Sequence, residues 1–495
     1  MKNTLPIALL LIATIVFSVK TTQAQTENFK LSDYKNPDYL YQSLVMNFNF
    51  SNGFVIQRNG SQENEFGLNS AAGGNYLRYL NSTTRQAETQ LGLNAGFGIS
   101  NRNQELSQNY KTDRKSFNHG ESFQFSTSQR FYNTRQHFFE TSVSLSSNFS
   151  GSKQSQNNSG NNIEPESSKM KYKNFRNDIN AAIYVGKGRI EQVQDAQMAV
   201  FLLNDLQLLN RKNRDVSDEE VLELATLITK LKYKRFFDSR LRRIAEITAI
   251  DSFMQAKKIS GITDAMYFTS LNDNWAYANN PIRQSGYRGY IGLEGNLSLR
   301  NATSSRESDI IIGYNPVYDN TDRHTGTGAF LLAGYLYEKP ISLKWQKSAQ
   351  VRTGFGISRE SNEMKDRLND LTTKNYAELF PSISLSADYG YGFYPNTRTW
   401  ATFNWTLLAA WNKEMTGETK EDKTDLQKLI LAQTGPEISV YYYISPKLRL
   451  NANFSSQLRI IYQELFKREV NDPGVKGTTT RWSQGLNASL SYSIF

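Results

Sequence analysis

Long segments in which apolar and small polar residues alternate constrain the fold of this chain most. Between Leu91 and Ile99, the odd positions are apolar and the even positions are Gly or Asn. Because successive side chains of a strand point to opposite faces, such a segment forms a strand with one apolar and one polar face. The same alternation recurs in residues 139–149, 383–393, 401–411 and 448–460.

Strand length separates the two folds that such strands build. A soluble sandwich buries the apolar face, whereas a transmembrane barrel turns it toward lipid. Soluble strands average about 5–6 residues, and spanning strands need about 9–11. Many of the alternating segments are longer than about ten residues, and Trp and Tyr lie near their ends, as in interfacial aromatic girdles. The sequence therefore predicts an all-β transmembrane barrel.

Composition excludes several other classes. The mean hydropathy is −0.57, and beyond the N-terminal segment the chain has no apolar run of about 18 residues, which excludes a helical polytopic membrane protein. The chain has no Cys, which excludes a disulfide scaffold and thiolate metal sites.

Residues 1–24 have the pattern of an export signal. Lys2 gives a positive start, residues 5–19 are apolar, and Thr22-Gln23-Ala24 places small residues at a cleavage site. The apolar stretch is too short for a spanning helix, so we expect the mature chain to begin at Gln25. The formal net charge is +10. Because the protein is expected to be exported, we expect no nucleic-acid partner.

The alternation predicts about fourteen antiparallel strands, an even number as in single-chain bacterial barrels, with twelve or sixteen as alternatives. We place the strands near 43–52, 75–82, 89–100, 120–132, 136–150, 174–186, 286–300, 328–338, 341–358, 380–395, 398–413, 433–445, 447–463 and 480–495. Long polar loops are expected at 53–74, 101–119, 151–173, 301–327, 359–379, 414–432 and 464–479. Short turns are expected near 82–88, 133–135, 338–340, 395–397 and Pro446, and they mark the periplasmic side.

A helical insertion divides the barrel into halves at residues 25–186 and 286–495. Within residues 187–285, apolar residues recur at spacings of three and four in 193–210 and again after Ser217. Ser217 and Glu220 form a capping-box pattern. A third helix is expected near 238–257, with Leu241, Ile244, Ala245 and Thr248 on its apolar stripe. We expect this three-helix segment on the periplasmic side, as a separate domain or a partial plug.

Charged residues on the polar side of the strands are the candidate lining of a lumen. They include Arg176, Arg288, Glu294, Arg300, Lys344, Arg352, Asp388, Arg449 and Arg459. Mixed charge suits either a water-filled channel or a closed interior held by salt bridges. In a channel, the basic excess favours anionic solutes.

A run of basic residues in the insertion is a candidate binding face. It comprises Lys230, Lys234, Arg235, Arg240, Arg242 and Arg243. It would suit an anionic partner such as lipid headgroups, peptidoglycan carboxylates or an acidic protein. The alternative is a solvated helix face whose charges pair with nearby acids such as Glu223 and Glu246.

No motif indicates catalysis, a metal or a cofactor. His119 and His324 are expected in outer loops and His137 near an inner turn, and no pair of them has metal-ligand spacing. The glycines of 186–189 lack the spacing of a phosphate-binding loop, so we interpret them as the turn that leaves the barrel. We therefore expect no enzyme.

The chain resembles the outer-membrane β-barrel proteins of Bacteroidota. The resemblance rests on Tyr394-Pro395-Asn396-Thr397-Arg398, on its echo at 132–135, and on the terminal residues 491–495. The block 186–191, followed by Asp195-Ala196 and by 234–238, is similar to a helical periplasmic insertion in one group of these barrels. The resemblance implies an outer-membrane location and no catalytic residues.

Two functional hypotheses follow for an outer-membrane protein with both termini in the periplasm. The first is passive or gated passage of small solutes. The alternative is a structural or assembly role, in which the helical insertion docks an envelope partner. In either case we expect contact with membrane lipid and lipopolysaccharide, and with the barrel-assembly machinery during biogenesis.

Overall fold

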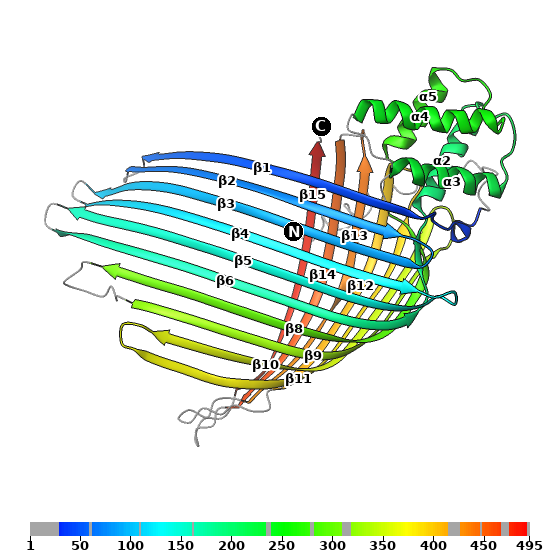
Figure 1. The fold of residues 1–495 in the computed structure, drawn as a ribbon. Coiled ribbons are helices and arrows are strands. Elements are labelled where there is room, and N and C mark those ends of the chain that lie inside the picture. Colours follow the sequence, from blue (N-terminus) through cyan, green and yellow to red (C-terminus); the bar gives the residue numbers. More distant parts are fainter. Residues whose placement is uncertain are drawn as a thin grey trace, which may run out of the picture.

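The computed structural model describes residues 29–58, 62–107, 110–160, 163–233, 239–277, 282–308, 318–413, 426–445, 448–466 and 475–492. Fourteen long strands form one antiparallel sheet in which each strand pairs with its neighbours in the sequence (Figure 1). The strands are β1 (Tyr39–Arg58), β2 (Gln62–Asn81), β3 (Arg85–Ser107), β4 (Tyr110–Tyr132), β5 (His137–Gly160), β6 (Ile163–Lys187), β8 (Gln284–Ser308), β9 (Tyr318–Pro340), β10 (Trp345–Asp366), β11 (Leu371–Phe393), β12 (Thr399–Lys413), β13 (Leu426–Tyr443), β14 (Leu448–Phe466) and β15 (Val475–Tyr492). The short strand β7 (Ile190–Gln192) pairs with β8 alone.

The predicted fold class is confirmed. Each of the fourteen expected strands overlaps one long strand of the sheet, and the helical segment interrupts the sheet between β6 and β8. The sheet curves strongly but is open, because β1 and β15 are its two edges and do not pair with each other within the described residues.

Five of the seven predicted long loops are wrong, and the other two, 414–432 and 464–479, lie in large part outside the described residues. β1 ends at Arg58 and β2 begins at Gln62, so most of 53–74 is strand. Residues 101–119, 151–173, 301–327 and 359–379 likewise belong mostly to strands. The alternation fades there because both faces of these strands are polar, and strand pairing continues without an apolar face to signal it. The short turns predicted at 133–135 and 395–397 lie where expected. The turn predicted at 82–88 is shorter, because β3 begins at Arg85, and the turn predicted at 338–340 lies at 341–344 instead. Pro446 lies outside the described residues.

The register keeps the two faces of the sheet distinct. Phe355 lies opposite Leu331 and Ile383 on the neighbouring strands, so apolar side chains share one face. On the other face, Arg352 lies opposite Gly334 and Ser386. The apolar face is exposed along the sheet, with Phe48 at 75% and Trp482 at 69% exposure. This exposed apolar surface is the opposite of what a soluble protein presents.

Four helices form a compact bundle at the end of the sheet that carries the short turns (Figure 1). They are α2 (Gln194–Leu208), α3 (Asp218–Lys232), α4 (Ser239–Ala256) and α5 (Ala265–Ala276). Ser217 caps α3, and Glu220 completes the predicted capping box. The sequence predicts three helices in this segment, so α5 is a fourth helix that the sequence analysis does not anticipate.

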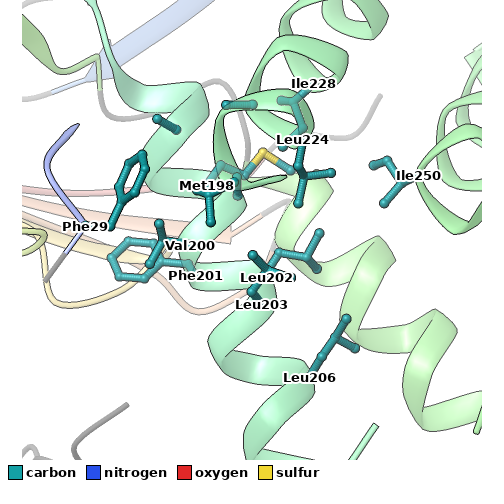
Figure 2. Packing of buried hydrophobic residues seen from close by; sticks show 14 of the residues in the cluster. Phe29, Met198, Val200, Phe201, Leu202, Leu203, Leu206, Leu224, Ile228 and Ile250 are labelled. Carbon is teal, nitrogen blue, oxygen red and sulfur yellow. The ribbon is translucent and has the colours of Figure 1, made fainter. Parts of the chain in front are cut away.

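The bundle has a dry apolar core centred on α2 and α3. Figure 2 shows Leu202, Leu203 and Leu206 of α2 packed near Leu224 and Ile228 of α3, and all five are fully buried. The predicted apolar stripes of α2 and α3 are confirmed, apart from Leu231 of α3, which is only partly buried. The stripe predicted for α4 is wrong: Ile244 is exposed, and the helix buries Glu246, Ile250 and Met254 instead.

Two glycines mark the places where the chain leaves the sheet and returns to it. Gly188 has φ +103° and Gly286 has φ +127°, a backbone conformation that side-chain-bearing residues rarely adopt. A Cβ at either position would also collide with a backbone carbonyl of the facing segment. The motif at 186–189 is therefore the turn that leaves the sheet, as predicted.

Candidate functional site: the polar face and the helical cap

Strand register places eight of the predicted lining residues on the polar face. They are Arg176, Arg288, Glu294, Arg300, Arg352, Asp388, Arg449 and Arg459. Lys344 does not belong to a strand, because it lies in the turn that precedes β10. The sequence reasoning omitted Arg481, although its position next to the exposed Trp482 puts it on the polar face by alternation.

Several of these charges meet in ion pairs along the polar face. Arg352 pairs with Glu294 at 2.8 Å, and the hydroxyl of Tyr184 donates to the same carboxylate at 3.2 Å. Nearer the short turns, Arg130 pairs with Glu140 at 2.7 Å, and both side chains are nearly buried. The face is therefore polar and partly neutralised, as the wall of a wet passage or a salt-bridged interior would be.

The helical bundle contacts the short-turn rim at widely separated points, and we call it the cap. Tyr233, after α3, stacks on Tyr39 of β1 with ring centroids 4.2 Å apart. Tyr277, after α5, packs edge-on against Tyr443 of β13 at 5.2 Å. These contacts lie near the two ends of the strand order, so the cap reaches from one side of the sheet to the other.

An ion pair reinforces the contact near β12. Arg398, in the turn before β12, pairs with Asp273 of α5 and lies over the ring of Tyr277 at 5.2 Å. The hydrogen bond to Asp273 raises the pKa of Arg398. Arg398 belongs to the motif on which the resemblance rests, but its partner is 125 residues away in sequence, so no local pattern predicted the pair.

Arg283 fixes the returning chain to the turn before β10. Its guanidinium is fully buried and donates to the carbonyls of Leu343, Ser342 and Trp345. Its Nε also donates to Gln346 at 3.1 Å. Burial lowers the pKa of Arg283 to about 10. Sequence reasoning missed this residue, because nothing local distinguishes it from other arginines.

The segment before β1 is part of the cap. Phe29, Leu31 and Tyr34 are buried in the apolar core of the bundle. The Tyr34 hydroxyl contacts Thr229 at 2.6 Å, and Thr229 donates to the buried Asp195 at 2.5 Å. Burial raises the pKa of Tyr34. The segment therefore ties the start of β1 to α2 and α3.

The predicted basic face is only partly a surface feature. Lys230 is exposed, but Arg242 pairs with Glu246 at 2.6 Å and Arg243 is half-buried. Burial lowers the pKa of Arg243. The neighbouring Lys232 is turned inward to the buried Asp195. Lys234 and Arg235 lie outside the described residues, as does the side chain of Arg240. Of the members whose side chains are described, Arg242 pairs with an acid, Arg243 is half-buried and Lys230 alone is exposed, so these three do not form a continuous basic patch.

The three histidines do not gather. His119 lies in β4 and His324 in β9, so their predicted placement in loops is wrong, and His137 begins β5 beside a short turn as expected. His119 contacts Glu121 at 3.1 Å, and His324 contacts Asn362 at 2.6 Å. Within the described ranges, no group of three or more His, Asp or Glu side chains is placed to hold a metal ion. None of the described helices is long and apolar enough to cross a bilayer.

Comparisons with known proteins give little guidance. No protein-family model and no curated protein matches the chain. Among solved structures, the chain is similar to the translocator domain of autotransporter NalP from Neisseria meningitidis, at 10% identity and a TM-score of 0.23, with 89% of this chain and 95% of that chain covered. BamA from Haemophilus ducreyi lacking POTRA domains 1–3 matches at 8% identity and a TM-score of 0.16, over 88% of this chain and 75% of that chain. At such TM-scores neither structure carries an argument about this chain.

Proposed function

We propose that this chain is an outer-membrane β-barrel that passes small polar solutes, with the cap as a gate at its periplasmic mouth. The observation that carries the proposal is the exposed apolar face of the long strands, opposite a face lined by paired charges. Lipid is the solvent that such an outer face requires, and water suits the inner one. The resemblance to Bacteroidota outer-membrane barrels supports the same location.

Closure of the sheet is part of this proposal. β1 runs away from the short-turn end and β15 runs toward it, because Tyr39 pairs with Asn81 and Tyr492 pairs with Leu448 beside short turns. The two edges are therefore antiparallel and able to pair. Unpaired backbone groups are very costly in hydrocarbon, so insertion into a bilayer favours that pairing.

The cap lies where it would control access. It contacts β1 through Tyr233 and the turns at the other side of the sheet through Asp273 and Tyr277. A body that bridges opposite sides of a closed rim lies across the opening. The contacts at Tyr233, Asp273 and Tyr277 are aromatic rings and one ion pair at the surface of the cap, the kind of contacts that open locally, whereas Leu343 of the turn before β10 is buried in the core of the cap and anchors it. We place the short-turn end, both termini of the mature chain and the cap in the periplasm, and we propose no catalytic role.

Planar-bilayer recordings with a bridged cap test this proposal. The chain has no Cys, so the double variant Tyr277→Cys, Tyr443→Cys can be joined by a short reducible bis-thiol reagent. We expect the unbridged protein to conduct, the bridged protein to fall silent, and reductant to restore conductance. Each single-Cys variant treated with the same reagent is the matched control and should stay conducting.

Other outcomes are equally clear. Conductance that bridging leaves unchanged would remove the gate from the proposal. Silence of the wild type and of the double variant Asp273→Asn, Arg398→Gln, in which the rim ion pair is gone, would remove the channel. In that case the docking role becomes the better hypothesis for the cap.

A further inference from the structure

A row of basic side chains crosses three neighbouring strands on the polar face. Arg176 of β6 lies directly opposite Arg300 of β8, and Arg300 lies directly opposite His324 of β9. Residues paired in this way share one face, with side chains close enough to interact. The row lies away from the cap, which is at the short-turn end of β6 and β8. Phe175 and Leu299, which precede Arg176 and Arg300 in sequence, are exposed on the apolar face, so the row lies at the level of the apolar band.

The protein balances the charges in this row only in part. Arg176 is paired with Asp178 of its own strand, at 2.7 and 3.2 Å. Arg300 has only a neutral contact, from its Nε to the side-chain oxygen of Asn174 at 3.1 Å, and within the described residues no ion pair is recorded for it. Like charges directly opposite each other destabilise a sheet unless an anion lies between them.

A hollow of about 600 Å³ lies over the row. Its lining includes Arg176, Ser298, Arg300, Asp322, His324 and Asn362. The Nδ1 of His324 contacts the side-chain oxygen of Asn362 at 2.6 Å, so Nδ1 carries the hydrogen and Nε2 remains as a second polar atom of the ring. The lining also includes two carboxylates, Asp322 and Glu363; Asp322 pairs in register with Ala302 and Met364 and is therefore diagonal to Arg300, but within the described residues neither carboxylate makes an ion pair with Arg300.

We propose that Arg176 and Arg300 form a binding site for an anionic group, carboxylate or phosphate, of the solute that enters the barrel. This rests on the proposed function and names its substrate class. Two guanidinium groups on adjacent strands present several N–H donors to one anion, and charge-assisted bonds of this kind are the strong ones. Arg459 and Arg481, also directly opposite each other on the polar face of β14 and β15, extend the preference for anions.

Calorimetric titration of the full chain in detergent tests the site directly. Citrate and inorganic phosphate are titrated separately, so that the two anion chemistries are distinguished. We expect one of them to bind the wild type, and Arg176→Gln, Arg300→Gln to weaken that binding at least tenfold. The matched control is Arg359→Gln, which removes the same charge from an exposed position on the opposite face of β10. It should bind as the wild type does.

Bilayer reversal potentials in a salt gradient separate this inference from the proposed channel. If the site is correct, the anion preference of the wild type falls in the double arginine variant and is kept in Arg359→Gln. Conductance without arginine-dependent binding overturns the site and leaves the channel. Arginine-dependent binding in a protein that never conducts upholds the site and overturns the channel. Equal binding by all variants, or none, overturns the site.

Discussion

Adjacent residues of one strand meet different surroundings in this molecule. Leu293 of β8 is 57% exposed on the apolar face, whereas Glu294 contacts Arg352 and Tyr184 on the polar face. In the proposed barrel, Leu293 would face lipid and Glu294, whose side chain is 25% exposed, would face water, and these two solvents impose opposite chemical requirements. The effect of a substitution therefore depends on the parity of its position more than on its depth in the fold.

Charge insertion at Leu293 tests this difference. A lysine or arginine facing lipid near the bilayer midplane costs about 2–4 kcal/mol, whereas the lumen side tolerates charge. We expect Leu293→Arg to lower the free energy of unfolding from phospholipid vesicles by about that amount. Asn296→Arg, on the polar face of the same strand, should change it little. Equal losses in both variants would argue against a lipid-facing surface.

The odd or even position of a residue along a strand also limits what the sequence predicts about that residue. It placed Glu294, Arg352 and Arg300 on the polar face, because alternation is a local property. It did not place Arg283 or the partner of Arg398, because those contacts join segments far apart in sequence. The run of basic residues did not show that Lys232 points into the cap, because its partner Asp195 lies on another helix.

At the scale of elements, helix α5 begins with a strong N-terminal cap. Asp264 accepts from the backbone N–H of Tyr267 at 3.1 Å and pairs with Arg211 at 2.5 Å. The bonds from Arg211, and then from Tyr267, lower the pKa of Asp264 to about 2. Because the folded state prefers the charged carboxylate, this cap stabilises α5 fully above the ordinary pKa of an Asp, and the stabilisation is lost as pH falls toward 2.

Asp264→Asn is therefore expected to have a pH-dependent effect. At pH 7 the variant should lose its helical circular dichroism at a lower temperature than the wild type, since it keeps the cap but loses the charge. Below about pH 4 the difference should narrow, and it should vanish near pH 2. Asp370→Asn, in an exposed turn of the sheet, is the control and should leave the helical transition unchanged. A difference that persists at pH 2 would assign the effect to geometry instead of charge.

Helices and strands could be predicted where their apolar residues recur at a regular spacing. The strands and the first three helices repeat their pattern over several turns or pleats, so existence and order came from sequence alone. Helix α5 is short, and its buried stripe mixes Tyr267, Leu271 and Trp275 with the polar Ser270 and Asn274, so its apolar periodicity is weak in the sequence. The outer strand ends were missed because two polar faces give no alternation, although their backbone pairs as regularly as elsewhere.

At the scale of the whole molecule, the two edge strands of the sheet, β1 and β15, decide how it can close. β1 and β15 are long strands with polar faces that include Asn47 and Asn49 on one edge and Ser483 and Asn487 on the other. In water such edges invite pairing with other chains. In a bilayer, pairing of the two edges with each other would satisfy both at once, so the proposed closure would be a property of the membrane-inserted molecule.

Cysteine pairs across this seam measure closure. Cys substitutions at Asn47 or Asn49, combined with Ser483→Cys or Asn487→Cys, should crosslink in liposomes, and efficiently for one register only. Asn47→Cys with Asn453→Cys, on β14, is the control, because β15 would lie between them. Crosslinks between separate molecules, or none across the seam, would contradict a closed monomer.

The residues that share the core of the cap are delivered at different times as the chain emerges. Phe29 and Tyr34 come from before the first strand, whereas Leu343 comes from the turn between β9 and β10, and all three are buried in the same cluster. A nascent chain delivered from its amino end makes the helices long before it supplies Leu343. When the helices are complete, the cluster lacks Leu343 alone, and that residue follows only after β8 and β9. The core of the cap is therefore completed when eight of the fourteen long strands have been delivered and β10 to β15 have not.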